Sequence, residues 1–178
     1  MGRTTVSVME MFRNRHSTRE YSQKDINLQD LGDLLWAAQG VNRDNGNLTA
    51  PTAMNKQEIV LYVFTDKDVC RYDPKSHSLT KVADGDHRDI VADRQDFAKA
   101  APVSLVIVAD GDKFGSTGEH SDIMMSVDAG IVCQNINLFC SAVGLKTVPR
   151  ASMNQKAIAQ LLKLGENQRA IMNNPIGW

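Results

Sequence analysis

Two nearly unbroken apolar runs stand out along the chain, at residues 58–65 and 103–109. β-Branched, aromatic and aliphatic side chains fill both runs, which is typical of strands covered on both faces of a sheet. We expect the first of these strands to be central. Residues 69–73 and 79–83 flank a turn-like Pro-Lys-Ser-His segment, and this arrangement predicts a hairpin at the periphery of the sheet.

Helical periodicity fills much of the remaining chain. Val8, Met9 and Phe12 share one face of a helix predicted over residues 6–13. A second helix is predicted to begin after Asn27, a favourable N-cap, and to end at Gly40, which can supply a left-handed stop. Further elements are expected as a polar helix at 86–99, a capped helix at 154–163 and a final strand around 169–172.

The longest predicted helix covers residues 121–143 and is apolar on more than one face, as at Ile123, Val127 and Ile136. A helix that is apolar all round must be buried on several sides. In a small domain we expect part of that burial to come from a second copy of the chain. A central helix inside a monomeric core is the alternative.

Helices and strands are mixed without strict βαβ alternation, which indicates an α+β fold with a sheet flanked by helices. The 178 residues suit one domain spanning 1–178. A net charge of −1 argues against binding to a nucleic-acid backbone, which needs a basic face. No apolar run approaches the ~20 residues of a membrane span, and the N-terminus lacks the regions of a secretory signal. We therefore expect a cytoplasmic protein, unless a signal or anchor was removed from the N-terminus.

The cysteines and histidines predict neither a disulfide nor a metal site. Cys133 and Cys140 lie in one predicted helix about 10 Å apart along its axis, and a disulfide needs Cα atoms within about 7 Å. Reduced thiols are expected, Cys70 included. The histidines have no metal-ligand spacing. The glycines at 111–118 match no nucleotide-binding motif, so we expect a flexible loop there.

The segment Arg15-His16-Ser17-Thr18-Arg19 is the first candidate site. Two guanidiniums four residues apart, beside a hydroxyl, form an anion clamp suited to a phosphate or another planar anion. A solvated basic helix end that runs into a turn is the alternative interpretation.

Two further segments give the chain its resemblance to a known family. Pro51-Thr52-Ala53-Met54-Asn55-Lys56-Gln57 directly precedes the strand at 58–65, and Asp128-Ala129-Gly130 leads through the long helix to Ala142-Val143-Gly144-Leu145. With the arginine segment, these resemble the nitroreductase family, which carries an Arg-[Arg/His]-Ser-x-[Lys/Arg] signature, then a Pro-Ser-x-x-Asn-x-Gln loop. The resemblance implies the nitroreductase fold, with a mostly antiparallel central sheet and the long helix at a dimer interface.

The resemblance also implies FMN bound at the interface of a homodimer. Arg15 and Arg19 would pair with the phosphate or the polar edge of the flavin ring, and His16 and Ser17 would contact the ribityl chain. A loop of the partner subunit would line the flavin through Pro51, Thr52, Ala53, Asn55 and Gln57. The alternative interpretation of this segment is a capped loop before a strand with no role in binding.

A turn after the long helix matches the place where the family presents backbone N–H groups to flavin N5 and O4. Its residues are Pro149, Arg150, Ala151 and Ser152. Donors there would stabilise charge on the reduced flavin. The Arg150 side chain is expected in solvent or against a substrate carboxylate.

The implied reaction is ping-pong hydride transfer from NADH or NADPH to flavin N5 and on to a nitroaromatic, a quinone or a similar small-molecule oxidant. The absence of a Ser-His-Asp set, a Cys-His pair or a carboxylate dyad at motif level fits a cofactor enzyme. Alternatives are a flavin-dependent dehydrogenase or oxidase of a metabolite or peptide azoline, an FMN-binding protein with little turnover, and an α+β interaction module.

Overall fold

A single antiparallel sheet forms the middle layer of the molecule in the computed structural model, which describes residues 6–178. The strand order is β3-β2-β1-β4-β6-β5. The two apolar runs become adjacent central strands, and the predicted hairpin lies at one edge, so both expectations are confirmed. The strands are β1 (Ile59–Phe64), β2 (Asp68–Asp73), β3 (Ser78–Asp84), β4 (Val103–Asp110), β5 (Lys146–Thr147) and β6 (Gln168–Gly177).

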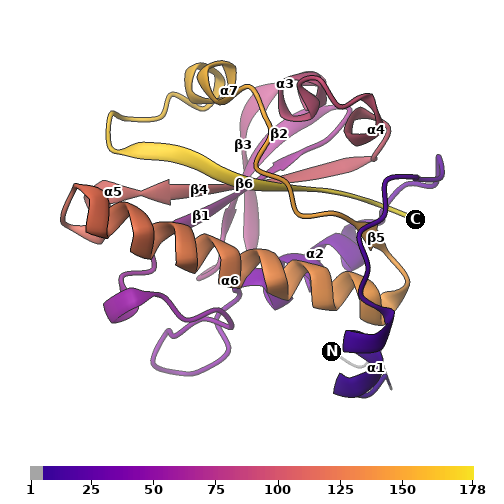
Figure 1. Cartoon of the computed structure of the whole chain (residues 1–178), viewed down its shortest axis with the longest axis horizontal. Coiled ribbons are helices and arrows are strands. Elements are labelled where there is room, and N and C mark those ends of the chain that lie inside the picture. Colours follow the sequence, from indigo (N-terminus) through magenta and orange to yellow (C-terminus); the bar gives the residue numbers. More distant parts are fainter. Residues whose placement is uncertain (1–5) are drawn as a thin grey trace.

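Helices cover both faces of this sheet (Figure 1). The long helix α6 and helix α2 lie on one face, with α1 at the end of α6, whereas α3, α4 and α7 lie on the other face. This arrangement confirms the predicted α+β fold. The helices are α1 (Val8–Asn14), α2 (Leu28–Gln39), the 3-10 turn η1 (Ala53–Asn55), α3 (Arg88–Ala92), α4 (Asp96–Lys99), α5 (Gly111–Phe114), α6 (Glu119–Val143) and α7 (Gln155–Leu162).

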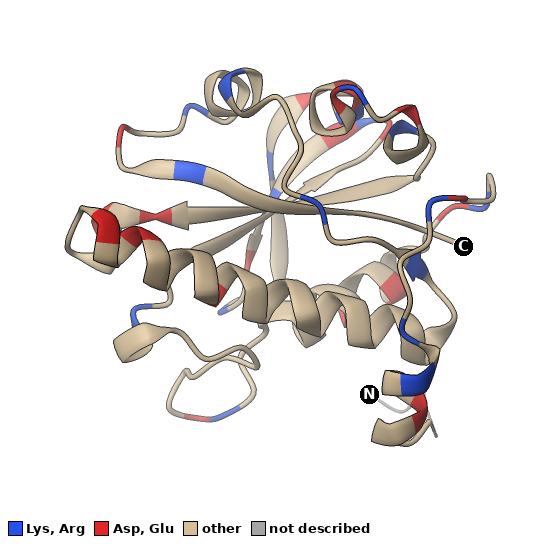
Figure 2. Cartoon of the chain, viewed as in Figure 1, with Lys and Arg blue, Asp and Glu red and all other residues tan. Residues whose placement is uncertain are grey.

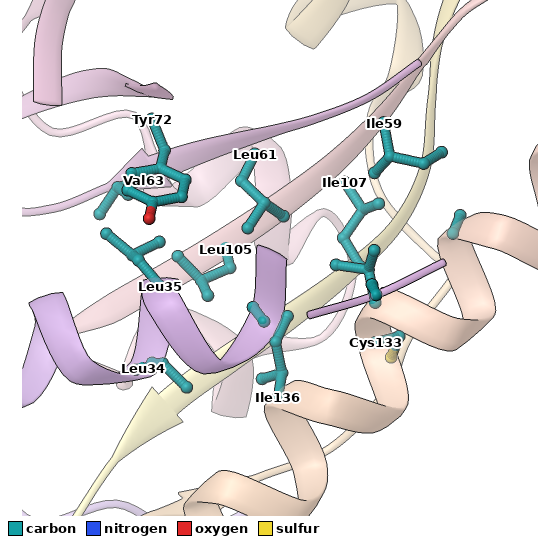
Figure 3. Packing of buried hydrophobic residues seen from close by; sticks show 14 of the residues in the cluster. Leu34, Leu35, Ile59, Leu61, Val63, Tyr72, Leu105, Ile107, Cys133 and Ile136 are labelled. Atoms are coloured by element: carbon teal, nitrogen blue, oxygen red, sulfur yellow. The ribbon is translucent and has the colours of Figure 1, made fainter. Parts of the chain in front are cut away.

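The larger hydrophobic core lies between the sheet and helices α2 and α6 (Figure 3). Leu35 of α2, Leu61 of β1 and Ile136 of α6 meet there, each with 1% or less of its surface exposed. A second, smaller cluster fills the space under α3 and α7. Both faces of β1 are therefore covered, which explains why its sequence is apolar without alternation.

Helix α2 begins and ends as residue spacing predicts, but the reason for its final glycine differs. Asn27 caps the helix by accepting from the Asp30 N–H at 2.8 Å. Gly40 has φ −75° and is extended, so the expected left-handed stop is wrong. A Cβ at this position would lie 2.4 Å from a Trp36 side-chain atom. Glycine is needed here because the Trp36 side chain approaches the backbone.

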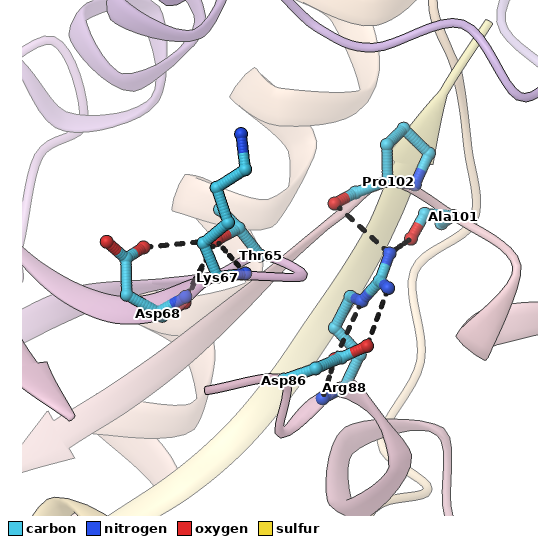
Figure 4. Close-up of polar contacts among 7 residues, drawn as sticks. All are labelled: Thr65, Lys67, Asp68, Asp86, Arg88, Ala101 and Pro102. Carbon is cyan, nitrogen blue, oxygen red and sulfur yellow. Dashed lines mark hydrogen bonds and ion pairs between the residues drawn. The ribbon is translucent and has the colours of Figure 1, made fainter. Parts of the chain in front are cut away.

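The predicted polar helix at 86–99 is two short helices, α3 and α4, because the chain turns at Asp93 with φ 54°. Arg88 fixes the start of α3 (Figure 4). Its Nη1 donates to the carbonyls of Ala101 at 3.0 Å and Pro102 at 3.4 Å. Its Nη2 pairs with Asp86 at 2.7 Å, so the guanidinium joins α3 to the start of β4.

The β1–β2 turn is closed by side-chain bonds that Figure 4 also shows. Thr65 Oγ1 accepts from the N–H groups of Lys67 and Asp68, each at 3.1 Å.

Two other expectations need correction. Part of the loop expected at 111–118 is helix α5, and the final strand is longer than 169–172.

Helix α6 is, among residues 6–178, the one helix long and apolar enough to cross a membrane by length and composition. Its buried positions pack on the sheet and on α2, as the core helix of a globular domain does. The sequence expectation, which rested on the length of the apolar runs, did not identify α6 as a helix of this length and composition. Cys70, Cys133 and Cys140 are all free thiols.

Candidate functional site

The extended segment after α1 is held by its backbone against the end of the sheet. Thr18 N–H donates to the Thr147 carbonyl of β5 at 3.0 Å, and Ser22 N–H donates to the Trp178 carbonyl at 2.7 Å. The Tyr21 hydroxyl donates to the Thr18 carbonyl at 3.0 Å and packs beside the end of β6. The predicted anion clamp thus has a fixed backbone.

A buried amide network holds β5 in turn. Asn174 Nδ2 donates to Asn137 Oδ1 of α6 and to Thr147 Oγ1, both at 3.1 Å. Cys133 Sγ donates to Asn174 Oδ1 at 3.1 Å. Because these buried polar groups satisfy one another, the strand that anchors Thr18 is locked to the long helix.

The side chains of the clamp point into solvent. Arg15, His16, Ser17 and Arg19 are all exposed. No carboxylate lies within ion-pair distance of Arg15 or Arg19 in residues 6–178. Basic positions are visible on the segment in Figure 2 (blue), whereas the C-terminal half of α6 is uncharged. Two guanidiniums are therefore available for an anion.

Arg150 lies in the opposite environment, with 6% of its surface exposed. Its guanidinium donates to the Val91 carbonyl at 3.2 Å and the Ala92 carbonyl at 2.9 Å, at the end of α3. It also donates to Asn173 Oδ1 at 2.7 Å and Gln95 Oε1 at 2.9 Å. Burial lowers the pKa of Arg150. The expectation of a solvent-facing or substrate-facing side chain is wrong, because this guanidinium ties α3 to β6.

The 149–152 turn offers fewer backbone donors than its length suggests. Pro149 has no N–H, and the Arg150 N–H donates to the Asn173 carbonyl at 2.9 Å. Within the described residues, no hydrogen bond uses the N–H groups of Ala151 or Ser152, and both residues are exposed. These two are the backbone donors that the turn can present.

Phe97 of α4 joins the turn to the arginine segment. The Arg19 guanidinium carbon lies 5.9 Å from the centre of the Phe97 ring, and the Arg150 guanidinium carbon lies 5.6 Å from it. Both distances are within the range of cation–π attraction. The structure thus brings two of the three predicted site segments together in one chain.

The third segment, the loop 51–57, has an unusual backbone. Met54, Asn55 and Gln57 have φ values of 52°, 54° and 51°, a left-handed conformation that is uncommon outside glycine. Gln57 N–H donates to Thr52 Oγ1 at 2.8 Å, and Ala53 N–H donates to Asp128 Oδ2 of α6 at 2.8 Å. A shape with this many left-handed residues persists because such contacts enforce it.

The amide side chains of this loop are used inside the chain. Asn55 Nδ2 donates to Asn47 Oδ1 at 3.1 Å, and Gln57 Nε2 donates to the Gly46 carbonyl at 3.1 Å. Met54 is 75% exposed, and Pro51 is also exposed. The side of the loop away from its own chain is therefore apolar at Met54.

The loop and the arginine segment contact different parts of α6. Ala53 is tied to Asp128, whereas Met11, just before the arginine segment, accepts from Ser141 Oγ at 2.9 Å. Asp128 and Ser141 are 13 residues apart (141 − 128), which corresponds to about 20 Å along the helix axis. One chain therefore does not bring the third segment to the other two.

Sequence reasoning gave no role to Glu58, Asp128 or Phe97. Glu58 is fully buried at the start of β1, and Asp128 is 4% exposed. A signal was present for Glu58, because a carboxylate directly before a wholly apolar strand is expensive to bury. Phe97 carried no comparable signal, since its role depends on two arginines far apart in sequence.

Comparisons with known proteins agree with this architecture. The Nitroreductase family profile matches residues 12–178. The Methanocaldococcus jannaschii protein named "Putative nitroreductase MJ1384" is 28% identical over 182 residues, which cover 97% of this chain and 91% of that protein.

Solved structures give the same result. A crystal structure described as a putative nitroreductase (reut_a1228) from Ralstonia eutropha JMP134 is 34% identical with a TM-score of 0.90, covering 97% of this chain and 82% of that one. A nitroreductase family protein of Streptococcus pneumoniae TIGR4, 15% identical, shares the fold with a TM-score of 0.70, covering 97% of this chain and 90% of that one. With a profile match over nearly the whole chain and a relative above 30% identity, the chain belongs to the nitroreductase family.

Proposed function

We propose that this nitroreductase family oxidoreductase is an FMN-dependent homodimer that uses NADH or NADPH to reduce nitroaromatics, quinones or similar acceptors. The observation that carries the proposal is the separation of the site segments along α6. Segments 15–19 and 149–152 meet near Phe97. Loop 51–57 is bonded to α6 at Asp128, about 20 Å along the helix axis from Ser141, which bonds Met11 just before the arginine segment. Two copies packed in opposite directions along α6 would place the loop of one against the arginines of the other.

The residues present suit FMN. Arg15 and Arg19 are exposed guanidiniums without an acidic partner in the described chain, and such groups bind phosphate in a fork geometry. The unused N–H groups of Ala151 and Ser152 suit the electron-rich edge of the flavin. When bound, FMN would supply the hydride exchange between the nicotinamide and the acceptor.

The protein's own contribution is to bind and orient. The fixed backbone at Thr18 positions the arginines for the phosphate, and His16 and Ser17 lie between them for the ribityl chain. The donors of the 149–152 turn would favour negative charge at the ring. From the partner copy, Pro51, Thr52, Ala53, Asn55 and Gln57 would cover the ring. Positioning of this kind leaves the hard chemistry to the cofactor.

Exposed apolar side chains support the second copy. Val8, Met9 and Phe12 of α1 are 59%, 70% and 54% exposed, and Ile123 and Val127 of α6 are 51% and 53% exposed. The two groups lie toward opposite ends of α6, and exposed apolar surface of this kind marks interaction sites. The helix face that sequence analysis assigned to a partner is thus partly uncovered.

A spectral titration tests the activity. We expect the purified protein to bind FMN, to bleach anaerobically with NADH or NADPH, and to regain its colour when a nitroaromatic or quinone is added. Bound FMN that stays oxidised with both nicotinamides but bleaches with a metabolite donor would favour the dehydrogenase alternative. Failure to bind FMN would contradict the proposal.

The dimer is tested separately by placing a charge on α6. We expect Ile123→Asp and Val127→Asp to convert a dimer into a monomer in sedimentation, with loss of bound FMN. Val82→Asp is the matched control, because Val82 is 41% exposed on β3, away from α6. A wild-type monomer that binds one FMN per chain would overturn the shared site.

A further inference from the structure

We propose that Glu58 and Asp128 share one proton and that this proton holds loop 51–57 in the shape that receives FMN. The inference rests on the proposed function for the cofactor, whereas the burial of both acids and the bond from Ala53 to Asp128 are features of the fold. Glu58 and Asp128 are then positioning residues that act through the loop.

The geometry at Glu58 does not suit an ionised carboxylate. The side chain has no exposed surface, and neither carboxylate oxygen accepts a hydrogen bond from a donor in the described residues. An unpaired charge buried in this way is strongly unfavourable. The acid is therefore expected to keep its proton in the folded protein.

Asp128 is the partner for that proton. Asp128 raises the pKa of Glu58 through a side-chain hydrogen bond and through its charge, and two carboxyl groups can bond to each other only when one of them is protonated. A protonated Glu58 would donate to Asp128, whose Oδ2 already accepts from the Ala53 N–H at 2.8 Å. Asp128 then accepts in both contacts.

This chain of contacts reaches the strained part of the loop. Ala53 begins η1, and the next two residues, Met54 and Asn55, are left-handed. Residues in such conformations are retained only where surrounding contacts enforce them. Loss of the proton from Glu58 would remove its hydrogen bond to Asp128 and place a negative charge beside Asp128. The bond from the Ala53 N–H to Asp128, which fixes the loop, would then weaken.

The charged groups that act on Glu58 come from two helices. Burial is the largest cause that raises the pKa of Glu58, to about 7, and Asp128 of α6 raises it further. The Lys113 ammonium of α5 and the residue's own N–H act in the opposite direction. The nearby Asp110 carboxylate accepts from the Lys113 N–H and from Gln168, so its charge is used in capping α5.

The pH dependence follows from this shift. Because the pKa of Glu58 rises from 4.5 to about 7 on folding, the folded protein binds more protons than the unfolded chain within that window. The contribution of Glu58 to the stability of the FMN-free protein should be largest below pH 4.5 and should be lost as the pH rises through about 7. Glu58→Gln mimics the protonated acid and should remove this fall.

The test measures the unfolding free energy of the FMN-free protein and its FMN dissociation constant, each from pH 5 to 8.5. If only the protonated pair holds the loop, wild-type affinity should weaken about tenfold between pH 6 and pH 8. Glu58→Gln should keep the low-pH affinity throughout, and its profile corrects for titration of the FMN phosphate itself. Asp128→Asn should also flatten the profile, because its amide can donate to ionised Glu58 while its oxygen keeps the Ala53 contact.

The outcomes separate this inference from the proposed function. FMN binding with the same pH profile in wild type and Glu58→Gln would overturn the proton-shared loop while leaving the oxidoreductase standing. Absence of FMN binding at every pH would overturn the proposed function and the cofactor role of the loop. Identical unfolding profiles for wild type and Glu58→Gln would overturn the shared proton itself.

Discussion

Arg19 and Arg150 contact the same aromatic ring but stand in opposite environments. Arg19 is exposed, with its guanidinium 5.9 Å from the Phe97 centre, whereas Arg150 is 6% exposed, with its guanidinium 5.6 Å from that centre. The buried guanidinium donates to four groups of its own chain. The exposed one retains its donors for an outside anion.

The difference shows that a residue type in a site motif does not fix its role. A buried arginine whose guanidinium is bonded to its own chain stabilises the fold, whereas an exposed arginine on a fixed backbone keeps donors that can bind a ligand. Arg150 joins α3 to β6, and Arg15 and Arg19 are the exposed arginines that we propose bind the phosphate. Substitutions at the two places should therefore affect different measurements.

The largest expected effect is loss of stability in Arg150→Ala. The substitution leaves the buried Val91 carbonyl and Asn173 Oδ1 without their donor, and each buried unsatisfied group costs about 1–3 kcal/mol. We expect the free energy of unfolding to fall by about 3 kcal/mol or more in urea denaturation. Arg150→Lys should lose less, because an ammonium keeps part of the donor set. If Arg150→Ala lowered the free energy of unfolding as little as Arg15→Ala does, the proposed difference between the buried and the exposed arginine would be contradicted.

The next effect is loss of cofactor affinity in Arg15→Ala and Arg19→Ala. Removing a charged partner of a phosphate should cost roughly 1.5–3 kcal/mol of binding, or about ten- to a hundredfold in the FMN dissociation constant. The unfolding free energy should stay within about 0.5 kcal/mol of wild type in Arg15→Ala, because the Arg15 side chain is exposed. It should fall by up to about 1 kcal/mol in Arg19→Ala, which also loses the contact with Phe97. Fluorescence titration measures the affinity. Lys156→Ala, which removes an exposed cation on α7, is the control and should bind FMN normally.

The smallest effect is expected at the shared ring. Phe97→Leu keeps an apolar side chain but removes the cation–π attraction, which contributes about 0.5–1 kcal/mol. Urea denaturation of Phe97→Leu, Arg19→Ala and the double variant isolates the coupling between ring and guanidinium. A coupling energy of zero would mean that Phe97 only fills space between the two segments.

Much of the fold could be predicted from the sequence because local patterns and tertiary packing agree. Strands β1 and β4 are covered on both faces, and their sequences are apolar throughout; Asn27 sits where a helix needs a cap. Errors arose where the sequence pattern does not show how the backbone turns or which atoms meet. Gly40 is required by the Trp36 side chain, and the break at Asp93 between α3 and α4 has no pattern in the polar sequence.

The roles of the site residues were harder to predict than the fold, because contacts between residues far apart in the sequence decide those roles. The motif order located the arginine segment, the loop and the turn, but burial assigns their roles. No local pattern shows that the Arg150 guanidinium reaches the end of α3, or that Asp128 holds Ala53 from 75 positions away. Residue spacing can indicate that two chains meet, but it does not show which of their residues are in contact.

Subunit complementation is the measurement that tests the shared site most directly. One variant carries Arg15→Ala with Arg19→Ala, and the other carries Asn55→Asp, an isosteric change at an exposed loop residue whose left-handed φ of 54° suits Asp. Each is expected to lose FMN alone. After the two are unfolded and refolded together, mixed dimers should contain one intact site, so FMN bound per chain should recover to about one quarter of wild type. No recovery, with mixed dimers demonstrated by a tag on one variant, would show that each chain binds FMN by itself and would contradict the account.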